Sequence, residues 1–231
     1  MTNSLDFTAV DLASCIESTL LSDDVSEVDI DELCTGAIWF RFAGVCVYPK
    51  HVVYAAELLS NVAVKVVTVV NFPKGDAPLA DVLNQIESVV ADGADEIDFV
   101  MDISHALSND WDLVSEGIAA VVASAHQHQK LLKVILETCL LNDSQISRAC
   151  QIARENGADF VKTSTGFSTG GATVEAVRLM RSVIGNSMGI KASGGIRDRE
   201  IALALVNAGA NRIGTSSALK IIGAVSEVNQ A

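Results

Sequence analysis

A lysine follows a short apolar run in D-F-V-K-T-S-T-G, residues 159–166. If this run is a buried strand, desolvation disfavours the ammonium form of Lys162 and lowers its pKa. A neutral amine can attack a carbonyl carbon and form a Schiff base, so Lys162 is a candidate nucleophile. The competing interpretation is that its side chain extends to solvent or pairs with a carboxylate, which is the commoner arrangement for a single strand-end lysine.

A second lysine, Lys191, lies in G-I-K-A-S-G-G-I-R, which predicts the next strand. Two ammonium groups near the carboxyl ends of adjacent strands repel each other, so the pKa of at least one is lowered. Lys162 then reads as the nucleophile and Lys191 as its electrostatic partner, but repulsion alone would allow the reverse. Neutralisation of both by carboxylates stays open. Lys65 and Lys133 lie nearer the amino ends of their strands, where residues more often serve stability, although Lys133 could reach an inner charge network.

Eight short strands rich in Val and Ile must position these lysines. They are expected at residues 16–21, 42–48, 64–70, 96–100, 131–137, 160–162, 189–192 and 212–214, and helical segments alternate with them. Strands without a polar face are typical of parallel β/α units. Eight units in 231 residues favour a single α/β domain over residues 1–231, a (β/α)8 TIM barrel with a short helix at about residues 8–15. A doubly wound open sheet is the alternative.

An internal repeat adds a carboxylate to the two lysines. Three segments each contain a glycine, an alanine, an Asp or Asn and then a strand: residues 91–100, 155–164 and 207–216. Asp98, Lys162 and Gly214 occupy equivalent places in the three copies. These copies fall on alternate strands, which share side-chain layers inside such a barrel. We therefore expect Asp98 and Lys162 to point inward at one height, with Gly214 leaving space. Asp98 could accept and return a proton, or simply form a salt bridge with a lysine.

Glycines and serines follow the last two strands. Gly194 and Gly195 come after the seventh, and Gly214, Ser216 and Ser217 belong to the end of the eighth and the turn after it. In TIM barrels these loops often bind phosphate through backbone N–H groups and a short extra helix, which the residues from 217 onward could supply. The pattern predicts a phosphorylated small sugar as the ligand.

Composition excludes several classes of function. A net charge of −13 and a pI near 4.6 argue against nucleic-acid and anionic-membrane partners. The sequence shows neither a signal peptide nor a long apolar run, so we expect a cytoplasmic protein without a membrane span. The five cysteines form no C-x-x-C, and His126 and His128 do not share a helix face. No metal site is expected.

Several motifs resemble those of the deoxyribose-phosphate aldolases, which are class I aldolases. They are D-F-V-K-T-S-T-G-F, G-G-A-T, I-K-A-S-G-G-I-R and R-I-G-T-S-S, supported by V-C-V-Y-P, V-V-N-F-P-K-G, A-D-E-I-D-F-V and L-K-V-I-L-E-T. The resemblance covers essentially the whole chain. It implies reversible cleavage of 2-deoxy-D-ribose 5-phosphate to acetaldehyde and D-glyceraldehyde 3-phosphate, without a metal or organic cofactor. A homodimer is a possible assembly.

The same resemblance implies residue roles. Lys162 becomes the Schiff-base lysine, Lys191 the residue that depresses its pKa, and Asp98 the proton donor and acceptor. Cys46 is implied to lie near the substrate, although its residue type alone is more typical of a small buried apolar side chain. The remaining substrate-binding candidates are Thr163, Gly194, Gly195, Gly214, Ser216 and Ser217.

Two positions depart from the family pattern. Glu17 stands where the family usually has an aspartate that contacts the sugar hydroxyl and the second lysine, and the extra methylene could shift or weaken that contact. Phe167 stands where some members have a lysine that helps to hold phosphate. Phosphate affinity would then depend more on backbone N–H groups, with a less strict preference for phosphorylated aldehydes.

Three other functions fit the barrel less well. The first is another Schiff-base enzyme, such as a transaldolase-like enzyme or a different sugar-phosphate aldolase. The second is a non-catalytic sugar-phosphate binding barrel, which would not need a neutral amine. The third is an enediol isomerase, which would need a carboxylate base and would not depend on Lys162.

Overall fold

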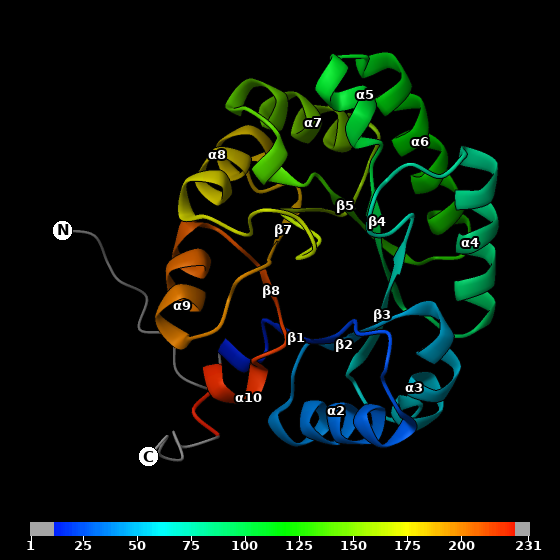
Figure 1. The fold of residues 1–231 in the computed structure, drawn as a ribbon, viewed down its shortest axis with the longest axis vertical. Helices are drawn as coiled ribbons and strands as arrows, with labels where there is room; N and C mark the ends of the chain where they lie inside the picture. Colours follow the sequence, from blue (N-terminus) through cyan, green and yellow to red (C-terminus); the bar gives the residue numbers. More distant parts are fainter. Residues whose placement is uncertain (1–11, 225–231) are drawn as a thin grey trace.

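The computed structural model describes residues 12–224, and within them eight parallel strands close into a barrel (Figure 1). Each strand pairs with its neighbour in sequence, and the last pairs with the first. The strands are β1 (Ile16–Leu20), β2 (Gly44–Val47), β3 (Lys65–Val70), β4 (Glu96–Val100), β5 (Leu131–Ile135), β6 (Phe160–Lys162), β7 (Gly189–Ser193) and β8 (Arg212–Thr215). The predicted (β/α)8 barrel is confirmed, and the open sheet is wrong because β8 pairs with β1.

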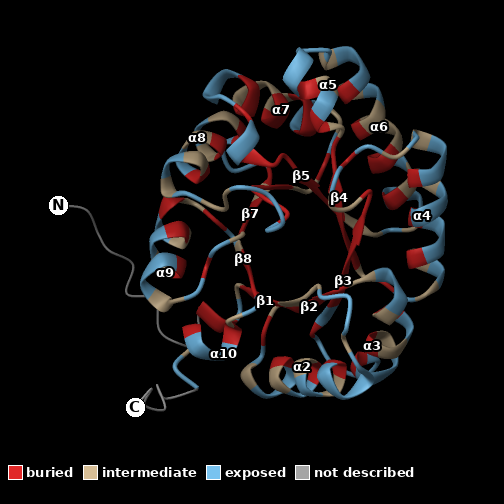
Figure 2. Cartoon of the chain, viewed as in Figure 1, coloured by how far each residue is buried: buried red, intermediate tan, exposed pale blue. Residues whose placement is uncertain are grey.

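Helices surround the barrel and bury their inner faces against it (Figure 2). The longer ones are α2 (Glu27–Phe40), α3 (Val52–Leu59), α4 (Leu79–Ala91), α6 (Trp111–Gln127), α7 (Asp143–Glu155), α8 (Val174–Ile184) and α9 (Arg199–Ala208). Shorter turns of helix are α5 (Ile103–Ser108), α10 (Ala218–Ile221), and the 3-10 segments η1 (Pro49–His51) and η2 (Thr138–Leu140). None of the described helices has the length and apolar character needed to cross a bilayer.

Strand β4 shows why the strands lack a polar face turned to water. Ile97 and Phe99 belong to the main apolar core between the strands and the helices. Because successive side chains alternate, Glu96 and Asp98 point into the barrel, where both are buried. Both faces of the strand are therefore removed from water, and the inner face carries charges.

Several element bounds differ from the expected ones. The first half of the short helix expected at residues 8–15 falls within residues 1–11, which lie outside the described part of the chain; in the second half, Leu12 and Ala13 are helical. The fifth strand was expected to reach residue 137 but ends at Ile135. Glu137 has a left-handed backbone with φ of 56°, which cannot continue a strand. The sequence pattern also gave no indication of α5.

The close approach of β6 and β7 provides a stability test. A Cβ added at Gly189 would overlap the ring of Phe160 on the neighbouring strand. We expect Gly189→Ala to lower the free energy of unfolding by about 1–3 kcal/mol, the usual effect of overpacking. Gly117→Ala is the matched control: Gly117 lies inside α6 and an added Cβ meets nothing within 4 Å. It should stabilise the protein by about 0.5–1 kcal/mol. Urea denaturation measures both, and a Gly189→Ala variant as stable as the parent would contradict the argument.

Candidate active site

Two lysines and one carboxylate meet inside the barrel near the carboxyl ends of its strands. Lys162 of β6 and Lys191 of β7 are register partners, so their side chains leave the sheet on the same side. Each Nζ donates to Oδ2 of Asp98 at 2.6 Å. All three side chains are buried, with exposed fractions of 2% or less. The contact between Asp98 and Lys162 is the one that the internal repeat predicts.

Gly214 leaves the space that this arrangement needs. A Cβ at Gly214 would lie 2.9 Å from Cε of Lys191 and 3.1 Å from Cβ of Ser193. A side chain at this position of β8 would therefore compete with Lys191 for space. The short distances fit the expectation that Gly214 leaves room in this layer, and its part in substrate binding stays a prediction.

A third lysine, Lys133, forms ion pairs with Asp98 and with two further carboxylates deeper in the barrel. Nζ of Lys133 lies 3.0 Å from Asp98 Oδ1, 2.6 Å from Glu96 Oε2 and 3.5 Å from Glu17 Oε1. Lys133 therefore reaches an inner charge network, as the sequence allowed, and is a direct partner of Asp98. Strand register accounts for the contact, since Lys133 stands opposite Asp98 on the adjacent strand. The repeat relates alternate strands only and did not show which acid Lys133 would meet.

The charges of this cluster balance when Lys162 is neutral. Glu17, Glu96 and Asp98 supply three carboxylates. Lys133 and Lys191 supply two ammonium groups, and the guanidinium of Arg212 lies 3.5 Å from Glu17 and 3.9 Å from Glu96. A positive charge on Lys162 would be in excess among these groups. Excess charge is costly in a buried site, so the composition of the cluster favours the free amine.

The surroundings of the two lysines shift their pKa values in opposite directions. Burial lowers the pKa of Lys162, and the charge of Lys191 lowers it further against the opposing effect of Asp98. Burial also acts on Lys191, but Asp98 and Glu17 together raise its pKa well above the ordinary value. Of the two assignments that the sequence left open, the structure thus favours Lys162 as the neutral amine and Lys191 as the ammonium.

The two acids of the site are held in their ionised forms. Burial would raise the pKa of Asp98, but the charges of Lys133, Lys162 and Lys191 hold it well below its usual range. Lys133 has its own pKa raised to about 12, because its carboxylate partners outweigh its burial. The pKa of Glu17 is lowered in spite of burial, through Lys133 and Lys191. Asp98 is thus a carboxylate in this state, and a proton that it receives is readily passed on.

A pocket of about 270 Å³ opens above the two lysines. Its walls come from the loops after β1, β6, β7 and β8, and four of the predicted substrate-binding residues line it: Gly194, Gly195, Gly214 and Ser216. Arg197 also lines the pocket and is exposed. The motif I-K-A-S-G-G-I-R contains Arg197, but sequence reasoning did not select it, because its distance from the lysines depends on the turn after β7.

Four predicted substrate-binding residues do not line this pocket. Glu17 lies among the charges around Lys133 and accepts a hydrogen bond from Lys191, which retains the expected contact with the second lysine. Cys46 is fully buried, and burial raises the pKa of its thiol. The Thr163 hydroxyl donates to the Ser193 carbonyl at 3.1 Å, joining β6 to β7. The backbone N–H of Ser217 donates to Thr215 Oγ1 at 2.9 Å.

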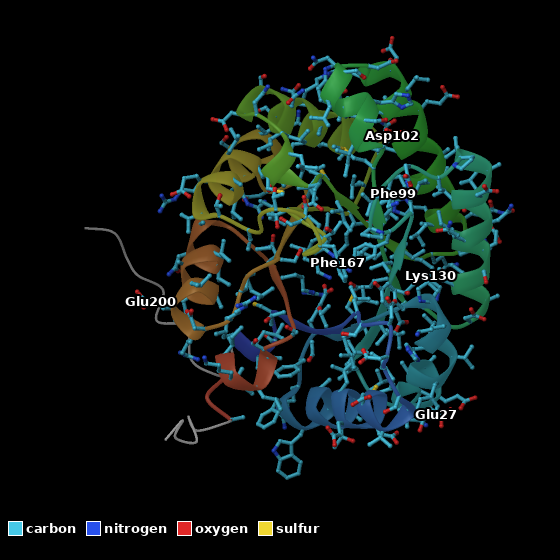
Figure 3. All side chains as sticks on the ribbon, in the orientation of Figure 1. Glu27, Phe99, Asp102, Lys130, Phe167 and Glu200 are labelled. Atoms are coloured by element: carbon cyan, nitrogen blue, oxygen red, sulfur yellow. The ribbon has the colours of Figure 1, made fainter. Side chains whose placement is uncertain are left out.

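A row of three aromatic side chains reaches the pocket at Phe167. Phe167 lines the pocket with 54% of its surface exposed, and Figure 3 shows it over the centre of the barrel. Its ring packs edge-on against Phe72, with centroids 5.2 Å apart, and Phe72 contacts Tyr48 at 6.1 Å. The position that could carry a phosphate-binding lysine is therefore part of an apolar wall.

Glu137 holds the loop that follows Lys162. Its carboxylate accepts hydrogen bonds from the backbone N–H and the hydroxyl of Thr165. Glu137 is 1% exposed, and its left-handed backbone turns it toward that loop. A strained backbone at a non-glycine residue is often found where a site must be held in place. Sequence reasoning did not select Glu137, since E-T after a strand has no distinctive spacing.

Metal-binding geometry does not occur in the described part of the chain, where no group of three His, Cys, Asp or Glu side chains is placed to hold an ion. His126 and His128 instead pair with separate acids. Nε2 of His126 lies 2.9 Å from Asp159, and Nε2 of His128 lies 3.0 Å from Glu87. The histidines thus join α6 to two different neighbours.

Comparison with known proteins finds relatives that are named deoxyribose-phosphate aldolases. A relative from Thermococcus gammatolerans, named deoxyribose-phosphate aldolase, is 48% identical over 215 residues, covering 92% of this chain and 96% of its own. Deoxyribose-phosphate aldolase 1 of Vibrio vulnificus is 45% identical over 207 residues, covering 90% and 94%. The solved deoxyribose phosphate aldolase of Aeropyrum pernix superposes with a TM-score of 0.88 at 37% identity, over 94% of this chain and 92% of that one.

The family comparison covers nearly all of the sequence. The model of the DeoC/LacD family aldolases matches residues 8–226, which include every strand of the barrel and every residue of the lysine cluster. The chain belongs to the DeoC/LacD family of aldolases.

Proposed function

We propose that this protein is a class I deoxyribose-phosphate aldolase. It reversibly cleaves 2-deoxy-D-ribose 5-phosphate to acetaldehyde and D-glyceraldehyde 3-phosphate through a Schiff base on Lys162. The observation that carries the proposal is a buried lysine with a lowered pKa that shares one carboxylate oxygen with a second lysine, at the base of a pocket. Relatives of the same family carry this activity in their names.

The geometry suits each proton transfer of Schiff-base formation. The neutral amine of Lys162 attacks the aldehyde carbon C1, and its surplus proton passes to Asp98 Oδ2, 2.6 Å away. Asp98 returns this proton to the alkoxide oxygen, which gives the carbinolamine. A second proton, which Lys191 can supply through the same Asp98 oxygen because its Nζ is also 2.6 Å from it, lets the hydroxyl leave as water and gives the iminium. Asp98 acts as a relay whose resting form is the carboxylate.

Carbon–carbon cleavage follows from the iminium. Its positive nitrogen withdraws the electron pair of the C2–C3 bond, the C3 hydroxyl gives its proton to Asp98, and D-glyceraldehyde 3-phosphate departs. Asp98 then gives this proton to C2 of the enamine, which returns to an iminium. Water then attacks that iminium, releasing acetaldehyde and regenerating the amine of Lys162. Burial of Lys162 and Asp98 strengthens each electrostatic contact during these steps.

We expect the phosphate end of the substrate to bind at the loops after β7 and β8. Gly194, Gly195 and Ser216 line that part of the pocket, and Arg197 can add a cation. Phe167 offers no positive charge to a phosphate. We infer that selection for phosphorylated aldehydes is weaker here than in a relative with lysine at this position.

Substrate contact by Cys46 stays a prediction. A change in KM for the substrate in Cys46→Ser would test it.

Assembly and location also stay predictions. A homodimer is expected from family resemblance, and light scattering of the purified protein would measure its oligomeric state; the Aeropyrum pernix relative is described as a tetramer. A cytoplasmic location is expected from composition, and cell fractionation would test it.

Reductive trapping tests the identity of the nucleophile. Borohydride in the presence of acetaldehyde should leave an ethyl group on Lys162, because only the imine is reduced to a stable amine. Peptide mass spectrometry locates the adduct. Lys162→Ala should remove it, whereas Lys65→Ala, which changes an exposed lysine of β3, should retain it. An adduct on Lys191 alone would reverse the two roles.

The pH dependence of kcat/KM tests the electrostatic role of Lys191. Only neutral Lys162 attacks, so kcat/KM should rise with pH through the Lys162 pKa, below the ordinary range for lysine. Lys191→Met removes a neighbouring positive charge, so the Lys162 pKa should rise and the acid limb should move to higher pH. Lys65→Met should leave the limb unchanged. A limb that stays in place, or moves to lower pH, in Lys191→Met would contradict the assigned role.

Substitution of Phe167 tests the phosphate preference. In Phe167→Lys, an ammonium can form a charge-assisted bond with phosphate worth about 1.5 kcal/mol, which corresponds to roughly tenfold. The ratio of kcat/KM for deoxyribose 5-phosphate to that for deoxyribose should rise by about this factor. Phe167→Leu removes the ring without adding charge and should not raise the ratio. A parent protein that already prefers the phosphate as strongly as a lysine-bearing relative would overturn the inference.

A further inference from the structure

A second cavity lies outside the barrel, between β4 and the helices that cover it. It has a volume of about 400 Å³ and lies among α4, α5 and α6. Its floor is apolar and is formed by side chains of the core between the strands and the helices: Val82, Phe99, Met101, Val114 and Ile118. Asp98 faces the inside of the barrel and Phe99 the outside, because they are neighbours on one strand. In Figure 3, Phe99 and Asp102 lie toward α5 and α6, apart from Phe167.

Gly117 lines this cavity from the middle of α6. Glycine inside a helix is less favourable than alanine, so its presence calls for a reason. Close packing does not supply that reason, since an added Cβ would meet nothing within 4 Å. The missing side chain leaves the wall of the cavity open at this point.

The rim of the cavity is acidic. Asp76 and Glu116 line it, both are exposed, and neither forms an ion pair with another residue of the described chain. Asp102 also lines it but is engaged: it caps α5 by accepting from the His105 N–H, and it pairs with the His105 ring at 3.1 Å. Two uncompensated carboxylates above an apolar floor attract a cation that carries an apolar body.

We propose that this cavity is a second binding site, which takes a small organic amine with an apolar or aromatic body. The body packs on the floor around Phe99 and Val114, and the ammonium group faces the carboxylates of Asp76 and Glu116. A volume of about 400 Å³ lies within the range of small-molecule sites, roughly 300–1,000 Å³. The active-site pocket cannot substitute for it, because Lys191 and Arg197 line that pocket and repel cations. The inference does not depend on the aldolase reaction.

Calorimetric titration with 2-phenylethylamine tests the proposal on the full chain. Saturable binding is expected, with affinity about tenfold above that of 2-phenylethanol, which has the same shape without charge, and weaker at high salt. 3-Phenylpropionate, which carries the opposite charge, should bind least. Equal affinities for the three compounds, or no saturable binding of the amine, would overturn the proposal.

Substitutions locate the site. Gly117→Leu should fill the cavity and weaken amine binding by about tenfold or more, whereas Ala123→Leu, an exposed change on the same helix, should have no effect. Glu116→Gln should weaken binding of the amine but not of the alcohol, and the exposed Glu200→Gln should change neither. Lys162→Ala should bind the amine normally. Binding that is lost in Lys162→Ala, or that is insensitive to both Gly117→Leu and Glu116→Gln, would place the amine elsewhere and overturn the proposal.

Discussion

The sharing of one Asp98 oxygen by two lysines is the constraint on which the site depends. Both Nζ atoms lie 2.6 Å from Oδ2, inside a barrel where the surrounding charges are also buried. Three carboxylates meet three permanent cations in this cluster, so a charge on Lys162 would be uncompensated. Burial disfavours the ammonium form of both lysines, so the difference between them comes from their neighbours: Asp98 and Glu17 together raise the pKa of Lys191, whereas the pKa of Lys162 stays lowered.

The barrel supplies what this cluster requires. A closed sheet of parallel strands brings side chains from β1, β4, β5, β6 and β7 to one axis, and the helices remove water from the other face of each strand. Gly214 provides room for Lys191, and Lys133 fixes the second oxygen of Asp98. Each of these residues lies on a rigid strand. This suits proton transfers, whose rates are sensitive to small displacements of the donor and acceptor atoms.

The loops above the barrel determine what enters. Glu137 holds the segment after Lys162 through Thr165, and the same segment carries Phe167 to the pocket. The aromatic row of Phe167, Phe72 and Tyr48 thus rests on a loop that a buried carboxylate orients. The contact between Glu137 and Thr165 therefore holds a segment that lies between the candidate nucleophile Lys162 and the pocket residue Phe167, which are only five positions apart in the chain.

Eight strands in the observed order could be predicted from the sequence, and Lys162, Lys191, Asp98 and Gly214 could be selected from it as candidate site residues. Hydrophobic patterning and the internal repeat are local properties, so they can be read along the chain. The three-dimensional arrangement was needed to favour Lys162 as the neutral amine, to show that Lys133 contacts Asp98, and to show that Arg197 lines the pocket whereas Cys46 and Thr163 do not. These outcomes depend on distances between residues far apart in sequence, such as Glu17 and Lys191, which are separated by 174 positions. The electrostatic interaction between two such residues weakens as the distance between them across the barrel grows. Their spacing along the chain does not give this distance.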